Sequence, residues 1–286
     1  MANPVCLSPL KFYDDPAKQC HHKSYAFGHI SPLIVKLGYL PVFQFVLPSN
    51  NTLSSAYIRN TKGQRVTGNI KTALTESGFS IVSIKSYHVV IYGGNLTIAS
   101  ITHEGQYYLE LNFSGNISYY SEVFCATNAV NDCIEVEYWN RGNNSFYIKN
   151  GVIAFPGNFH FKILLKTELG KPEYNFEEEA TKRLGYSFIE SQVSKKTYKF
   201  NVIVPEFICD AMRIIRLCSD KIIRCKSDEY EAITFEMEAD WQTQGDLASV
   251  TCEFETDNVV ANLGGFVPIP AGGDYNGDYN EDFDNQ

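Results

Sequence analysis

The chain has 286 residues, of which 44% are hydrophobic, 14% aromatic and only 20% charged, and its formal net charge is −9. This composition excludes a disordered chain and a helical bundle and is typical of sheet proteins, and the length suits two domains of ordinary size. An acidic chain without a dense run of Lys and Arg has no electrostatic attraction for nucleic acid, so we expect no nucleic-acid partner.

The N-terminal segment, residues 1–35, is predicted to be an extended arm, because prolines interrupt its short apolar runs. It contains Cys20-His21-His22 and His29, but no second Cys/His pair follows at the spacing of a zinc site, so we expect no metal ion. It has no basic region followed by an apolar stretch, and the chain has no apolar run of ~20 residues. We therefore expect folding in a cytoplasm, no membrane insertion, and mostly free thiols.

Residues 36–128 are predicted to form an immunoglobulin-like β-sandwich, because short strands follow one another with turns between them and no convincing helix. The apolar run 40–48 has a proline near each end, as expected of a strand that is buried on both faces or lies at an edge. Residues 77–84 alternate between apolar and polar. Gly93-Gly94-Asn95 is a tight-turn signature, which predicts a hairpin between the strands on either side of it.

A long β-hairpin is predicted over residues 105–124, hinged at Ser114-Gly115-Asn116. In its first strand, apolar and polar residues alternate, so one face packs inward and the other can meet water. The apolar face consists of Leu109, Leu111 and Phe113, and the polar face of Glu110 and Asn112. Gly105-Gln106-Tyr107 matches the Gly-x-Tyr of a tyrosine corner, whose hydroxyl bonds back to the backbone. The alternative is two surface tyrosines on a hairpin.

Paired tyrosines flank this hairpin and are better candidates for packing or subunit contact than for catalysis. The C-terminal tail, residues 263–286, is acidic, rich in Gly, Asp, Asn and Tyr, and has no means of building its own core. We therefore predict that it is a second assembly arm. The interface candidates are Tyr107, Tyr108, Tyr119, Tyr120, Tyr275, Tyr279 and Phe283.

Residues 129–262 are predicted to be an α+β domain, an antiparallel sheet that carries one helix. In its first strand, residues 134–139, Glu135 and Glu137 take the face opposite the apolar side chains. Two carboxylates invite comparison with a glycosidase pair. Two residues apart on one strand, however, they lie side by side on a solvated face, and nothing in the sequence positions a sugar between them.

The rest of this domain contains one predicted helix. Residues 171–196 are predicted to be a long charged connection with at most one or two helical turns. After a strand at residues 198–204, Pro205-Glu206 begins a helix that runs to about Leu217, because apolar side chains recur there at helical spacing. Three further strands are predicted over residues 221–225, 231–241 and 247–256.

The sequence contains none of the common enzyme motifs that we searched for. There is no Gly-x-Ser-x-Gly, no His-Glu-x-x-His, no Walker loop and no Gly-x-Gly-x-x-Gly. We therefore expect no enzyme and no cofactor. A Cys–His pair assembled in space from the six histidines and eight cysteines is the alternative that stays open.

Five short segments carry a resemblance to a known family. They are YYSEVF at 119–124, IEVEYW at 134–139, GKPEYNFEE at 170–178, PEFICDAMRIIR at 205–216 and WQTQGDLASVTCEFETD at 241–257. Over roughly residues 105 to 260, the chain resembles virion structural proteins encoded by phages and prophages of Bacteroidetes. The resemblance implies a tail, collar or baseplate component that forms homo-oligomers, contacts other virion proteins and resides in the virion after synthesis in the host cytoplasm. It carries no catalytic motif and so implies no active-site residue.

Two alternative functions stay open at this point. A receptor-binding or carbohydrate-binding module would explain the sandwich and the Tyr-rich hairpin, and it predicts binding by residues 36–128 alone. A glycan or peptidoglycan hydrolase requires clustered carboxylates or a Cys–His pair in one pocket.

Overall fold

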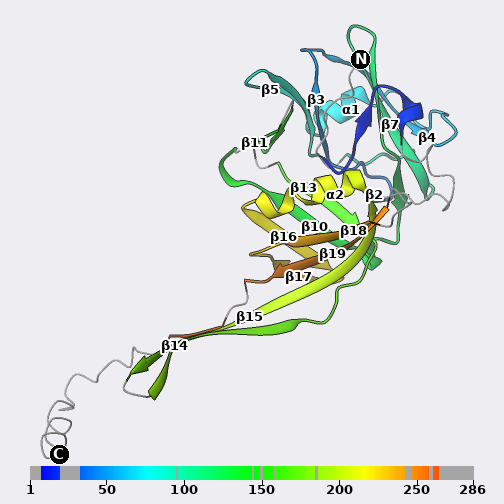
Figure 1. Cartoon of the computed structure of the whole chain (residues 1–286). Helices are drawn as coiled ribbons and strands as arrows, with labels where there is room; N and C mark the ends of the chain where they lie inside the picture. The colour runs from blue at the N-terminus through cyan, green and yellow to red at the C-terminus, as the bar shows by residue number, and fades with distance from the viewer. Residues whose placement is uncertain are drawn as a thin grey trace, which may run out of the picture. The chain divides into compact units, whose positions relative to one another are not determined.

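The computed structural model confirms a mostly β protein, in which strands far outnumber helices (Figure 1). It describes residues 8–19, 33–94, 96–143, 145–148, 151–157, 159–183, 186–241, 247–257 and 260–263. The chain divides into two compact units. Unit 1 comprises Met1–Pro172 and Thr197–Asp257, and unit 2 comprises Glu173–Lys196 and Asn258–Gln286.

A ten-stranded sheet runs through unit 1. Its order is β1-β8-β7-β9-β2-β13-β10-β16-β17, with β4 paired to β7, and only β2 and β9 are parallel. The strands are β1 (Phe12–Tyr13), β2 (Leu33–Lys36), β4 (Leu53–Asn60), β7 (Gly105–Phe113), β8 (Ile117–Ser121), β9 (Phe124–Thr127), β10 (Ile134–Trp139), β13 (Phe161–Leu165), β16 (Asp220–Cys225) and β17 (Asp228–Glu231).

This sheet contradicts the predicted division into domains. β7, β8 and β9 come from the predicted sandwich, whereas β10, β13 and β16 come from the predicted α+β domain, and all of them belong to one sheet over one hydrophobic core. β1 and most of β2 join the same sheet from the predicted N-terminal arm. The predicted boundaries at residues 35 and 128 are therefore wrong, because pairing between distant segments joins parts that sequence periodicity treats separately.

A second sheet packs against the ten-stranded sheet. It has the order β3-β6-β5 and consists of β3 (Phe43–Leu47), β5 (Phe79–Ile84) and β6 (Tyr87–Tyr92). β3 is buried along its whole length, as the apolar run at residues 40–48 predicts. The ring centroid of Phe45 in β3 lies 6.4 Å from that of Phe113 in β7 and 5.4 Å from that of Tyr119 in β8. Inner side chains of the two sheets thus interdigitate, as in a β-sandwich.

The long hairpin is confirmed as β7 and β8. Gly115 and Asn116 in its turn have φ values of 78° and 59°, the left-handed region that Gly and Asn adopt at least cost. Tyr107 Oη donates a hydrogen bond of 2.9 Å to the carbonyl oxygen of His103, which is the backbone contact expected of a tyrosine corner.

The second predicted hairpin does not form at Gly93-Gly94-Asn95. β6 pairs instead with the preceding strand β5, and none of the described residues from 96 to 101 belongs to a strand. A Cβ on Gly94 would lie 1.3 Å from the carbonyl oxygen of Ser77. The glycine is therefore required by close approach of two backbone segments and not by a hairpin turn.

A third sheet carries the predicted helix. In unit 1 it consists of residues 197–205 of β15 (Tyr186–Pro205), then β19 (Leu247–Glu255), then β18 (Glu236–Trp241). Helix α2 (Glu206–Met212) contacts β19 and is followed by a 3-10 turn at Ile215–Leu217, so the predicted helix is confirmed. The single strand predicted over residues 231–241 is wrong, since β17 ends at Glu231 and β18 begins at Glu236.

Smaller elements complete unit 1. Helix α1 (Lys71–Glu76) has six residues, and its N-cap residue, Ile70, has no side chain that can cap it, which explains why sequence periodicity missed it. β11 (Ser145–Ile148) and β12 (Gly151–Ala154) form a two-stranded sheet. Other 3-10 turns are Pro16–Lys18, Val130–Asp132 and Arg141–Asn143.

Unit 2 contains strands where a charged connection with helical turns was predicted. It comprises β14 (Glu173–Arg183), residues 186–196 of β15 and β20 (Val260–Leu263), which pairs with β15. The helical turn predicted around Glu177–Arg183 is wrong. Charged residues on both faces of β14 remove the alternation that identifies a strand in sequence.

Candidate functional site

The hairpin tyrosines pack inside the chain. Tyr107 and Tyr108 are buried, Tyr119 is only 1% exposed, and Tyr120 is half-buried. The three buried rings therefore have little surface to offer a second subunit, and burial corrects their assignment as interface residues. For Tyr120, a role in a subunit interface stays a prediction. The tail candidates Tyr275, Tyr279 and Phe283 lie outside the described residues.

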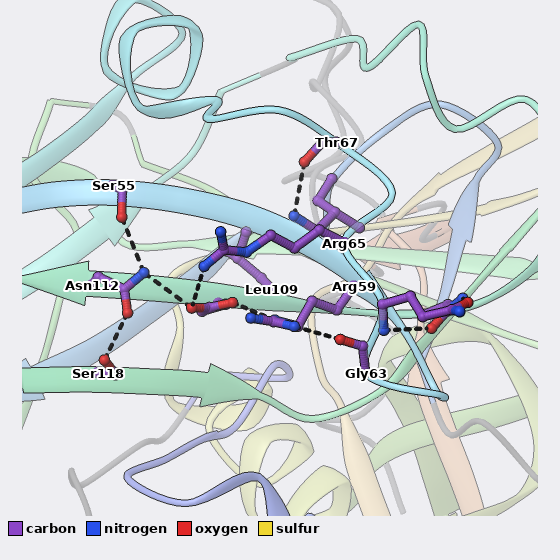
Figure 2. A network of polar contacts seen from close by, with 12 residues as sticks. Ser55, Arg59, Gly63, Arg65, Thr67, Leu109, Asn112 and Ser118 are labelled. Carbon is purple, nitrogen blue, oxygen red and sulfur yellow. Dashed lines mark hydrogen bonds and ion pairs between the residues drawn. The ribbon is translucent and has the colours of Figure 1, made fainter.

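Glu110 is the centre of a polar network on the outward face of β4, β7 and β8. Figure 2 labels the neighbours Arg59, Arg65 and Asn112. The predicted exposure of Glu110 to water is wrong, because the residue is only 4% exposed. The Arg59 Nε donates to one carboxylate oxygen, and the Asn112 Nδ2 donates to the other at 3.1 Å. A second guanidinium, that of Arg65, lies 3.5 Å from the carboxylate. Asn112 also bonds Ser55 and Ser118, so the network spans three strands.

The network keeps the Glu110 carboxyl ionised. Burial alone raises its pKa, but hydrogen bonds from Arg59 and Asn112 and the positive charges of Arg59 and Arg65 outweigh burial, so the pKa lies below its usual value. The same hydrogen bond raises the pKa of Arg59. A carboxylate held in this way accepts protons poorly and is unsuited to act as a general acid.

Residues 61–70 cover the outer edge of β4, next to this network. Thr67 and Asn69 accept hydrogen bonds from the backbone N–H groups of Ile58 and Ala56, at 3.0 and 3.1 Å. The Arg65 guanidinium lies 3.7 Å from the ring centroid of Tyr57, so it covers one face of that ring. The outer edge of β4 is therefore covered by the protein's own residues, and Arg65 covers a face of the Tyr57 ring.

A second network surrounds Glu137 on the outward face of β10, β13 and β16. Arg224 Nη1 donates to Glu135 at 2.6 Å and to Glu137 at 2.5 Å, and its Nε donates to Glu229 at 2.6 Å. His160 Nδ1 lies 2.8 Å from the second oxygen of Glu137, and the His160 ring stacks on Trp139 at a centroid distance of 4.1 Å. One guanidinium thus forms ion pairs with three carboxylates.

The prediction of a solvated face is wrong for Glu137, which is only 7% exposed. Burial raises the pKa of its carboxyl, but hydrogen bonds from Arg224 and His160 and the charge of Lys162 bring it below the usual value. Glu135 and Glu137 share the Arg224 guanidinium instead of facing each other across a space. This geometry leaves no room for the sugar that a glycosidase pair must flank.

The described thiols are free. Cys125, Cys133, Cys209, Cys218, Cys225 and Cys252 form no disulfide, which confirms the prediction for these residues. Burial raises the pKa of Cys209 to about 11 and those of Cys218 and Cys252 to about 12, so these thiols stay protonated and weakly nucleophilic. No group of three or more potential ligands among the described residues is placed to hold a metal ion, and the sequence Cys20-His21-His22 with His29 lies outside those residues.

Two exposed aromatic side chains lie on one strand of unit 2. Tyr174 is 60% exposed and Phe176 is 72% exposed, and they occupy alternate positions of β14. The strand is tied to β15 by side-chain contacts, among them an ion pair of 2.8 Å between Lys195 and Glu177. Sequence reasoning missed this pair of aromatics, because it assigned the segment to a connection.

Fold and contacts together define the class of the protein, a mostly β protein in which two buried carboxylates, those of Glu110 and Glu137, are held by internal ion pairs. No family model, curated protein or solved structure matches the chain. None of the described helices is both long and apolar enough to cross a membrane.

Proposed function

We propose that this chain is a bacteriophage virion structural protein, a component of a tail, collar or baseplate that forms homo-oligomeric rings or bridges rings. The phrase-level resemblance to virion proteins of Bacteroidetes phages motivates this assignment. The same proposal includes other virion proteins as partners, the virion as location, an immunoglobulin-like topology for the sandwich and a role without catalysis.

The observation that supports assembly most directly is the exposure of Tyr174 and Phe176 on β14. Alternate residues of a strand share one face, so these two rings form one apolar patch. Aromatic rings gathered on a surface are typical of protein–protein contacts. Burying each ring against a neighbour yields about 1.5–3 kcal/mol before the entropy cost of association.

The length of β15 supports the same conclusion. This strand has 20 residues; residues 197–205 pair with β19 in unit 1, and residues 191–194 pair with β20 in unit 2. One strand therefore contributes paired residues to both units. In this proposal, β14 is the contact element, and its aromatic patch packs on a neighbouring subunit.

Light scattering of the full chain during gel filtration tests self-assembly. We expect oligomers for the unmodified protein and a shift toward monomer for Tyr174→Ser/Phe176→Ser. Tyr147→Ser is the matched control, because Tyr147 is 48% exposed on β11 in unit 1 and should leave the oligomer unchanged. Equal effects of the control and the double variant would count against β14 as the contact element.

Electron microscopy with the products of neighbouring genes tests the virion assignment. We expect rings, or decoration of rings formed by a neighbouring protein, when the purified components are mixed. A protein that stays monomeric and binds none of these products would contradict the proposal.

A further inference from the structure

We propose that the outer edge of β18 binds an extended basic segment of another polypeptide, which joins the sheet as an additional strand. This surface differs from the aromatic patch on β14 and goes beyond the proposed function, since it concerns the chemistry of a partner. The inference depends on three observations: an open backbone edge, unpaired carboxylates on one face and apolar side chains on the other.

The backbone edge of β18 is open. The strand pairs with β19 on one side in an unbroken ladder from Glu236↔Glu253 to Trp241↔Ala248. On the other side, no described residue pairs or hydrogen-bonds with its backbone. Alternate residues of such an edge direct their N–H and C=O groups outward, where an added antiparallel or parallel strand finds them.

Carboxylates line one face of this edge. Glu236, Glu238 and Asp240 are all exposed and share a face, since they alternate along β18. Glu236 lies 3.3 Å from Arg216, but Glu238 and Asp240 make no ion pair with any described residue. Glu253, directly opposite Glu236 in the register, is already paired with Lys199 at 3.5 Å, so Glu238 and Asp240 are the carboxylates that the inference uses.

The negative charge of these carboxylates determines which kind of strand can bind. A second copy of β18 would place carboxylates beside carboxylates, and like charges on adjacent strands destabilise pairing. A segment with Lys or Arg at alternate positions places cations there instead. On the opposite face, Met237 and Ala239 are half-buried and Trp241 is 45% exposed, so apolar residues at the intervening positions have a surface to pack on.

The edge of β4 shows what a closed edge looks like in the same protein. There, Val66 and Ile70 donate backbone hydrogen bonds of 2.9 Å to the carbonyls of Ile58 and Ala56. Among the described residues, no comparable segment covers β18. The described part of the chain thus protects the edge of β4 with its own backbone and leaves the acidic edge of β18 uncovered.

Fluorescence anisotropy with the full chain tests the proposal. The probe is a fluorescein-labelled peptide of alternating Lys and Val. Glu238→Lys/Asp240→Lys should raise its Kd about tenfold, because two attractive contacts become repulsive. The matched control Glu76→Lys/Asp132→Lys reverses two exposed carboxylates on α1 and in the 3-10 turn at Val130–Asp132, away from the edge, and should change the Kd by less than about twofold.

Two further probes separate strand addition from general attraction. A peptide of alternating Glu and Val, and a Lys/Val peptide with N-methylated alternate amides, should both bind at least about tenfold more weakly than the parent peptide. Far-UV circular dichroism checks that each variant is folded, and Glu238→Gln/Asp240→Asn, which removes charge without reversing it, should give an intermediate Kd.

Three results would overturn the inference. They are equal loss of binding in the control variant, equal binding of the N-methylated peptide, and no binding of the parent peptide to the unmodified chain. Because the test uses a monomeric probe and variants of β18 alone, its failure is distinguishable from failure of self-assembly through β14.

Discussion

Two buried glutamates on the same ten-stranded sheet are neutralised in opposite ways. Glu110 is one carboxylate that faces two guanidinium groups, those of Arg59 and Arg65. Glu137 shares the guanidinium of Arg224 with two other carboxylates, Glu135 and Glu229, and also has the Lys162 ammonium 3.4 Å away. Although both glutamates are buried, they do not depend equally on one arginine. Glu110 has a second guanidinium beside it, whereas the Glu137 network has more carboxylates than guanidinium and ammonium groups.

Removal of Arg224 should have the largest effect. Arg224→Met leaves Glu137 buried beside His160 and Lys162 and deprives three neighbouring carboxylates of the guanidinium that they share, so we expect the free energy of unfolding to fall by about 3 kcal/mol. Urea unfolding followed by circular dichroism measures this loss. Arg216→Met is the control, since Arg216 forms an ion pair between exposed side chains and should cost less than about 1 kcal/mol. Equal losses in both variants would mean that Arg224 does not hold the network.

Removal of Arg59 should cost less, about 2 kcal/mol, because Arg65 and Asn112 remain beside the Glu110 carboxylate. The double variant Arg59→Met/Glu110→Met removes the carboxylate that was left behind. It should therefore recover most of the loss in the same urea experiment. A double variant that is less stable than the single variant would contradict this explanation.

Acid should weaken the Glu110 network. Its folded pKa lies below the usual 4.5, so the folded protein binds fewer protons there than the unfolded chain. The ionised carboxylate contributes its full stability above about pH 4.5, and this contribution is lost as pH falls through the folded pKa. The stability advantage of the unmodified protein over Glu110→Gln should therefore shrink between about pH 6 and pH 3. An advantage that stays constant over this range would contradict the prediction.

Removal of Arg65 should have the smallest effect. Its side chain is exposed and lies 3.5 Å from Glu110, and its stacking on Tyr57 is the main contact that Arg65→Ala deletes. We expect a loss of about 0.5–1 kcal/mol in urea unfolding. A loss as large as that of Arg59→Met would show that the two arginines are equivalent and that Glu110 has no spare cation.

Local pattern predicted part of this protein well. The alternation around Leu109 and Leu111 predicted a buried strand face, and Pro205 with apolar residues at helical spacing predicted α2. The polar faces were predicted poorly. Glu110 and Glu137 were expected to meet water, because their cationic partners Arg59 and Arg224 are 51 and 87 residues away in the chain.

The sequence by itself determined the mostly β class, the hairpin of β7 and β8 and the helix α2, because each depends on the order of nearby residues. Only the tertiary structure decided which strands are neighbours, which carboxylates are buried and which edge is open. Those features depend on pairing between distant segments, and the side-chain period of a strand is the same whichever strand lies beside it.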